Sequence, residues 1–154
     1  MEERFKTFTL LIANISRCIR KIKTEEMAEH QLKSPHVSCL YYLYKGRGMT
    51  FGELCSVCEE DKANVSRSVK YLEENGYLAG HDTKGSKRYH TPLELTEKGL
   101  CVSKMIVEKI DAVLDRASDG LSEESRRILY RSLSLVNDNL QRICDGYGLS
   151  ETEN

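Results

Sequence analysis

Residues 61–76, DKANVSRSVKYLEENG, have the pattern of one short amphipathic helix between two stop signals. Asp61 is a favourable N-cap, and Gly76 is a favourable left-handed cap after the last turn. Three apolar residues recur on one side of this helix, at about 100° per residue, and are predicted to face a core: Val65, Val69 and Leu72. The opposite side is then an exposed surface of polar and basic residues.

Two further short helices are predicted upstream of residues 61–76. Ser34 provides an N-cap and Pro35 a first-turn proline for one of them, which glycines at positions 46 and 48 close. Its apolar and aromatic face consists of Val37, Leu40, Tyr41 and Tyr44. Thr50 and Glu53 have the spacing of a capping box. A brief third helix is therefore expected to run from Thr50 to about Cys58.

Downstream of Gly76 the helical period is lost, and short extended segments are predicted. Residues 77–79 and 88–95 are expected to be the strands of a hairpin, joined by the polar turn Thr83-Lys84-Gly85-Ser86. Pro92 has no backbone N–H, so it fits only an edge or a break in the second strand. Three short helices followed by such a hairpin are the plan of a winged helix-turn-helix lobe.

Three long amphipathic helices flank this lobe. They are predicted at residues 5–27, after an N-cap at Thr96, and from Ser122 to a stop at Gly146. Their inward-facing residues are expected to be Phe8, Leu11, Ile12, Ile15, Ile19 and Ile22 in the first; Leu100, Ile106, Val107, Ile110, Val113 and Leu114 in the second; and Ile128, Leu129, Leu133, Leu135, Val136, Leu140 and Ile143 in the third. The small middle lobe cannot cover three such stripes, so a second copy of the chain is the economical cover.

The predicted fold class is therefore mainly α with a small β-hairpin wing. Residues 33–96 are expected to form the winged helix-turn-helix lobe, and residues 1–32 and 97–154 a helical dimerisation region. The composition is that of a globular chain, with 154 residues, 40% hydrophobic and 31% charged. No apolar run approaches the ~18 residues of a membrane helix, and no basic segment precedes an apolar block. We expect a cytoplasmic protein that does not bind a membrane.

The exposed side of the helix at 61–76 has side chains suited to the DNA major groove. Arginine reads guanine, asparagine reads adenine, and lysine and serine bind phosphates. Residues 62–90 hold six lysines and arginines against three acids, a net charge of +3 in a chain of net charge -1. A solvated charged face without a ligand is the competing interpretation, since the whole chain is nearly neutral. The candidate DNA-binding residues are Lys62, Ala63, Asn64, Ser66, Arg67, Lys70, Lys84, Lys87 and Arg88.

Three motifs carry a family resemblance: DKANVSRSV at 61–69 followed by Leu72-Glu73 and Gly76-Tyr77-Leu78, then Leu95-Thr96-Glu97-Lys98-Gly99, then Leu121-Ser122-Glu123-Glu124. With them the chain resembles the MarR family of bacterial transcriptional regulators over nearly its whole length. The resemblance implies a homodimer whose first, fifth and sixth helices interlock, with two winged lobes on a near-palindromic operator. It also implies Arg88 as a minor-groove finger, although Lys87 stands where many members carry an aspartate.

These features predict a homodimeric DNA-binding transcriptional regulator, most simply a repressor. A small ligand or an oxidant would lower its operator affinity by changing the spacing of the two recognition helices. The resemblance implies small aromatic acids as ligands, and Phe8, Tyr41 and Tyr44 are the pocket candidates; an aromatic core is the alternative. No phosphate loop, Gly-x-Ser-x-Gly or His-Glu-x-x-His motif is present, so no enzymatic activity and no cofactor are predicted. The rival function is a helical adaptor, or a thiol or metal sensor, that keeps the fold without binding DNA.

Cysteine and histidine give only weak indications of metal or redox chemistry. The six cysteines are interpreted as thiols, and the single Cys55-x-x-Cys58 pair lacks the second pair of a usual zinc site. Cys18 could be a peroxide-sensing thiol, as in some members of the resembled family, but a buried packing cysteine is preferred. His30 and His36 could bind zinc together with Glu25, Glu26 or Glu29, yet solvated or capping histidines are the commoner case. No metal site is predicted.

Overall fold

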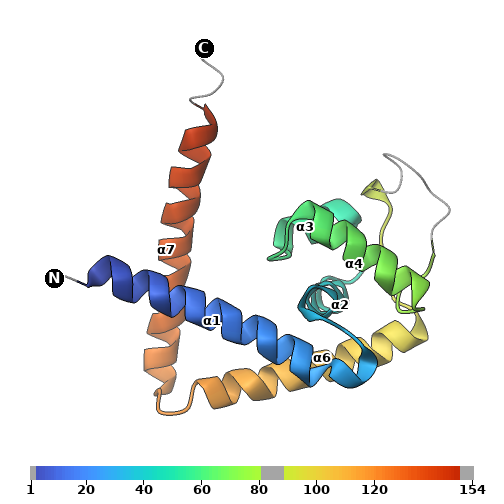
Figure 1. Ribbon diagram of the computed structural model, residues 1–154, viewed down its shortest axis with the longest axis horizontal. Helices are drawn as coiled ribbons and strands as arrows, with labels where there is room; N and C mark the ends of the chain where they lie inside the picture. The colour runs from blue at the N-terminus through green and yellow to red at the C-terminus, as the bar shows by residue number, and fades with distance from the viewer. Residues whose placement is uncertain (1–2, 81–88, 150–154) are drawn as a thin grey trace. The chain divides into compact units, whose positions relative to one another are not determined.

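The computed structural model describes residues 3–80 and 89–149, and most of these residues are helical (Figure 1). The chain divides into two compact units, residues 1–112 and residues 113–154. In the first unit, α4 packs mainly against α2, and α2 also packs against α1 and α3. The elements in chain order are α1 (Arg4–Glu26), the 3-10 turn η1 (Ala28–His30), α2 (Ser34–Gly46), α3 (Phe51–Val57), α4 (Lys62–Glu74), α6 (Glu97–Ala117) and α7 (Glu123–Leu149).

The predicted N-caps start four of these helices. At α3 the capping box is complete, because Glu53 N–H donates to Thr50 Oγ1 at 3.2 Å and Thr50 N–H donates to Glu53 Oε2 at 2.8 Å. At α4 the N–H of Asn64 donates to Asp61 Oδ1 at 2.7 Å. Each cap satisfies an amide that the first turn leaves unpaired. The caps confirmed by a side-chain hydrogen bond are Thr50, Asp61, Thr96 and Ser122.

Two predicted helix ends are wrong. Ser34 is the first residue of α2 rather than its cap, because its N–H donates to Thr24 Oγ1 at 3.1 Å. The N–H of Lys33 is satisfied by His36 Nδ1 at 3.1 Å, so the helix extends one residue further back. Gly146 does not stop α7, which continues to Leu149. A glycine inside a helix costs only about 1 kcal/mol, and no proline follows to end it.

The core of the first unit confirms the predicted face of α4, because Val65, Val69 and Leu72 are all buried. The predicted face of α6 is partly wrong. Leu100 is 49% exposed, whereas Val102 and Ser103, two and three residues further along the helix, are buried. The other large, fully buried side chains of this core are Met27, Leu32, Val37, Leu40, Leu54, Leu78 and Ile106.

The start of α6 lies very close to the strand segment that follows α4. An ideal Cβ placed on Gly99 would lie 2.0 Å from the carbonyl oxygen of Tyr77. Thr96 joins the same two segments, since its hydroxyl donates to Gly76 O at 2.6 Å and its N–H donates to Tyr77 O at 3.1 Å. Only glycine at position 99 permits this approach.

Replacing Gly99 with alanine is therefore expected to destabilise the fold by about 1–3 kcal/mol, as overpacking against backbone does. For a chain of this size each kcal/mol lowers Tm by roughly 2–4 °C, which thermal unfolding followed by circular dichroism measures. Gly146→Ala is the matched control, because nothing lies within 4 Å of a Cβ at that helical position. Its Tm should stay the same or rise. Equal Tm values for the two variants would contradict the close approach at Gly99.

The base of the predicted hairpin is confirmed. Leu78 and Leu95 form an antiparallel bridge, and Ala79 N–H donates to Glu94 O at 2.9 Å. An unexpected third segment joins them, because Thr50 bridges Pro92 and Leu93 N–H donates to Met49 O at 2.9 Å. Pro92 therefore lies in a paired segment but donates no hydrogen bond itself, because the next residue supplies the N–H. Proline is tolerated in this way in an edge strand.

The second strand is shorter than predicted. It was expected from residue 88, but Tyr89 and His90 have helical backbone and pairing begins at Pro92. The reason is local, since Tyr89 packs onto α3 instead of continuing an extended ladder. The predicted turn at residues 83–86 lies outside the described residues.

Two helices present apolar side chains that the single chain leaves exposed. On α1 no residue is buried, and Phe5, Phe8, Leu11, Ile12, Ile15, Ile19 and Ile22 are between 38% and 81% exposed. On α7, considered by itself, Ile128, Leu129, Leu133, Leu135, Leu140 and Ile143 are between 39% and 58% exposed. Among the described residues, no helix is long and apolar enough to span a bilayer.

Candidate nucleic-acid interface

The outer face of α4 presents the polar and basic residues that were predicted from the sequence to bind DNA. Lys62, Ala63, Ser66, Arg67 and Lys70 are exposed. They lie opposite the buried apolar face of the same helix, which anchors α4 to α2. The basic face is therefore presented on a packed helix of 13 residues. Lys70 forms an exposed ion pair with Glu74 at 3.8 Å, which contributes little to stability.

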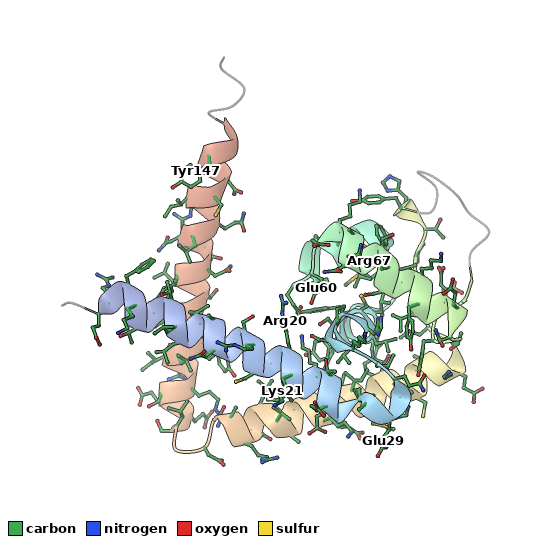
Figure 2. All side chains as sticks on the ribbon, in the orientation of Figure 1. Arg20, Lys21, Glu29, Glu60, Arg67 and Tyr147 are labelled. Carbon is green, nitrogen blue, oxygen red and sulfur yellow. The ribbon has the colours of Figure 1, made fainter. Side chains whose placement is uncertain are left out.

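A chain of hydrogen bonds runs along the first two turns of α4. Asn64, half-buried, accepts from Arg67 Nη2 through its Oδ1 at 2.5 Å. Its Nδ2 donates to Glu60 Oε2 at 3.2 Å. Figure 2 labels both ends of this chain, Glu60 just before α4 and Arg67 on it. The sequence pattern indicated Asn64 and Arg67 but not Glu60, although the spacing of four residues to Asn64 is visible in the sequence.

Tyr89 lies against the start of α3 and the start of α4. Its ring meets Phe51 edge-on, with centroids 5.8 Å apart, and the Lys62 ammonium lies 5.3 Å from the Tyr89 centroid. Gly52 makes room for it, since a Cβ there would lie 2.5 Å from Tyr89 Cε1. This contact joins the end of the hairpin to the helix-turn-helix. The hairpin candidates Lys84, Lys87 and Arg88 lie outside the described residues.

A polar cluster ties α1 to α2 and to the segment before α4. Lys23 Nζ donates to Ser38 Oγ at 2.9 Å and forms an ion pair with Glu59, and Ser38 Oγ donates to Glu59 Oε1 at 2.8 Å. Burial raises the pKa of Glu59, but the hydrogen bonds from Lys23 and Ser38 outweigh it, so the pKa lies below its usual value. Burial and the Glu59 carboxylate raise the pKa of Tyr42 to about 12. Glu59 is thus ionised and Tyr42 neutral at pH 7.

This cluster borders a small cavity of about 170 Å³. Its lining consists of Lys23, Ser38, Tyr41, Tyr42, Glu59 and Ile110. The three residues predicted for a ligand pocket lie in different places. Tyr41 lines this cavity, Tyr44 lines a separate cavity of about 630 Å³ beside Leu93 and Leu95, and Phe8 lies on α1 with 39% of its surface exposed. The charged cavity residues gave no signal in the sequence, because Lys23 and Glu59 are 36 positions apart.

The cysteines are free thiols in the structure. Cys18 is exposed on α1, so the expectation that it packs in a core is wrong for the single chain. Cys39 and Cys58 are buried, and a hydrogen bond between them, together with burial, raises the pKa of Cys39. Cys55, the other half of the C-x-x-C pair, is partly exposed. In the described ranges no three His, Cys, Asp or Glu side chains converge on a site for a metal ion.

The histidines considered for zinc serve other contacts. His36 stacks on Tyr71 with centroids 4.1 Å apart, and burial lowers its pKa, as does the nearby Lys33 ammonium. Its neutral Nδ1 accepts the N–H that starts α2. His30 contributes a backbone carbonyl, which accepts from the Tyr77 hydroxyl at 3.3 Å. One of the candidate acids, Glu26, pairs instead with Lys109 at 3.2 Å.

Comparison with known proteins supports the architecture. The MarR family model matches residues 30–88, which span α2, α3 and α4 and the base of the hairpin. A MarR family transcriptional regulator from Listeria monocytogenes, solved with a 26mer DNA, is 26% identical with a TM-score of 0.75, and the match covers 84% of this chain and 85% of that one. No curated protein sequence matches significantly.

Two further solved structures share the fold. MepR of S. aureus, solved with DNA, is 17% identical with a TM-score of 0.74, and the match covers 89% of this chain and 99% of that one. A MarR family protein of Mycobacterium tuberculosis, solved with p-aminosalicylic acid, is 20% identical with a TM-score of 0.62, covering 84% and 97%. The family match over residues 30–88 and the shared fold along the chain support the assignment of this protein to the MarR family of winged helix-turn-helix proteins.

Proposed function

We propose that this protein is a DNA-binding transcriptional regulator whose α4 helix enters the major groove. The observation that carries the proposal is the division of α4 into a buried apolar face and an exposed face with Lys62, Arg67 and Lys70. Such a helix can approach DNA without disturbing its own packing. Two proteins of the same fold, from Listeria monocytogenes and S. aureus, are solved with DNA.

We propose that the regulator acts as a homodimer. The helices α1 and α7 each carry a continuous stripe of exposed apolar side chains, which isolated apolar surface residues do not form. A second copy of the chain offers matching stripes that could cover them. In this arrangement residues 1–32 and 97–154 form the dimerisation region, and residues 33–96 form the DNA-binding lobe. Two lobes would then contact grooves about one helical turn, ~34–36 Å, apart on a near-palindromic operator.

We propose a repressor whose operator affinity falls when a small aromatic acid binds. The cavity beside Tyr41 supports this, because two tyrosines line it and Lys23, already paired with Glu59, supplies a cation that an acid would share. Glu59 also connects the cavity to the segment that precedes α4. A relative of the same fold is solved with p-aminosalicylic acid. Tyr44, which lines the separate cavity, and Phe8, on α1, are not part of this cavity. A ligand acts here only through a difference in affinity between the DNA-competent state and the other state.

Fluorescence-anisotropy titration of a labelled duplex from the promoter beside the protein's own gene tests DNA binding. We expect it to bind more tightly than a scrambled duplex of the same length, with an affinity that falls steeply as salt rises from about 50 to 200 mM. Equal affinity for both duplexes would refute the choice of operator. If neither duplex binds even at low salt, the regulator proposal fails, and an adaptor on the same fold becomes the better explanation.

A further inference from the structure

Glu60 is an unexpected residue beside a surface proposed to bind a polyanion. It lies directly before the N-cap of α4, is only partly exposed, and places a carboxylate near the helix end that would meet phosphates. An acid at this place repels DNA and lowers affinity for every sequence. Capping does not explain it, because Asp61 already accepts the N–H of Asn64. Its hydrogen bond to the Asn64 side chain therefore points to another role.

The partners of Asn64 fix the orientation of its side-chain amide. Glu60 as a carboxylate can only accept, so it takes the Nδ2 end at 3.2 Å. Arg67 can only donate, so it takes the Oδ1 end at 2.5 Å. With both ends of the amide occupied, Asn64 connects two charged groups of opposite sign. One N–H and one lone pair of the amide remain unused, and its two charged partners fix how the amide is oriented.

The same chain restrains Arg67. A free arginine side chain loses rotamer entropy when it is ordered. Here one guanidinium N–H is already bound, while the other N–H groups of the exposed side chain remain available. An arginine already held in one rotamer therefore loses less side-chain entropy than a free arginine when it makes a two-point contact with guanine O6 and N7.

We propose that Glu60 is a positioning residue for sequence recognition, which acts through Asn64 to hold Arg67 in the rotamer that reads a guanine. Glu60 then increases the preference for the operator while it lowers affinity for DNA in general. The inference rests on the proposed function, since it assigns the specificity of the same α4 surface. It predicts that discrimination is concentrated at one guanine of each half-site.

The test begins with wild-type protein and a pool of duplexes with a randomised centre, from which the preferred site is selected. Anisotropy then gives Kd values for that site, for the site with single guanines replaced, and for a scrambled duplex. The variants are Glu60→Ala, Glu60→Gln and Asn64→Ala, each also combined with Arg67→Ala. Glu74→Ala is the matched control, because it removes an exposed acid from the same helix that contacts Lys70 and not Asn64.

Glu60→Ala should reduce the ratio of scrambled to specific Kd at least fivefold, while affinity for the scrambled duplex stays the same or increases. The double variant that combines Glu60→Ala with Arg67→Ala should have the same ratio as Arg67→Ala alone. Glu60→Gln keeps an acceptor oxygen and should retain most of the ratio. Asn64→Ala should lose discrimination at the same guanine as Arg67→Ala, which provides the test even if Glu60→Ala folds poorly. Glu74→Ala should leave the ratio unchanged.

An unchanged ratio in Glu60→Ala, or losses that add to those of Arg67→Ala, would overturn the inference while DNA recognition by α4 stands. Loss of discrimination at a different base in Asn64→Ala would also overturn it, because Asn64 would then read that base itself. If the selection with wild-type protein enriches no site, the proposed function fails, and the positioning role of Glu60 fails with it.

Discussion

Replacing Ile15 with glutamate is expected to convert the proposed dimer into a monomer and to weaken operator binding at least about a hundredfold. Ile15 lies near the middle of the apolar stripe of α1 and is 53% exposed in the single chain. A carboxylate buried there against a second copy would be unpaired, and a buried unpaired charge is strongly unfavourable. Loss of the second lobe removes the gain from two linked contacts, which is typically about 10²–10⁴-fold. Sedimentation equilibrium and anisotropy measure the two effects.

Ala13→Glu is the control for this substitution. Ala13 is exposed on the side of α1 away from the stripe, so it adds the same charge to the same helix without touching the proposed interface. We expect this variant to remain dimeric and to bind the operator as the wild type does. A dimeric Ile15→Glu protein, or a wild-type protein that sediments as a monomer at micromolar concentration, would be inconsistent with the dimer.

Replacing Arg67 with alanine is expected to remove most sequence preference. A two-point contact between arginine and guanine contributes about 1–3 kcal/mol of discrimination, and a dimer makes it twice, so the loss is about 2–6 kcal/mol, or roughly 30-fold at least. Arg67 is exposed on α4, so the substitution leaves no cavity. Affinity for a scrambled duplex should fall much less. Anisotropy with the operator and the scrambled duplex measures both changes.

Arg67→Lys separates charge from geometry. Lysine keeps the positive charge but cannot form the planar two-point contact, so it should preserve scrambled-duplex affinity while losing much of the preference. Lys104→Ala, which removes an exposed cation on α6 outside the proposed site, is the control for general electrostatics and should change the preference little. If Arg67→Ala weakened the operator and the scrambled duplex equally, Arg67 would be a phosphate contact only.

Much of the fold could be predicted from short-range patterns in the chain. The period of Val65, Val69 and Leu72 correctly predicted the buried face of α4, and the N-cap at Asp61 correctly predicted its start. These features depend on residues within four positions of one another, and helix caps and helix faces are stabilised within that range. The same reasoning failed at Gly146, because a glycine disfavours a helix without ending it.

The contacts between distant segments required the tertiary structure. Leu100 and Val102 are both apolar residues near the start of α6, and only the approach of Gly99 to Tyr77 turns Val102 inward and Leu100 outward. Similarly, nothing near Lys23 or Glu59 in the sequence indicates that they meet, and Tyr89 has no local pattern that places it over Gly52. Local hydrogen bonding and periodicity fix where helices begin and which faces are apolar. Which side chains meet across the cavity and beside α4 depends on how the helices pack, because these pairs are brought together by packing and not by spacing along the chain.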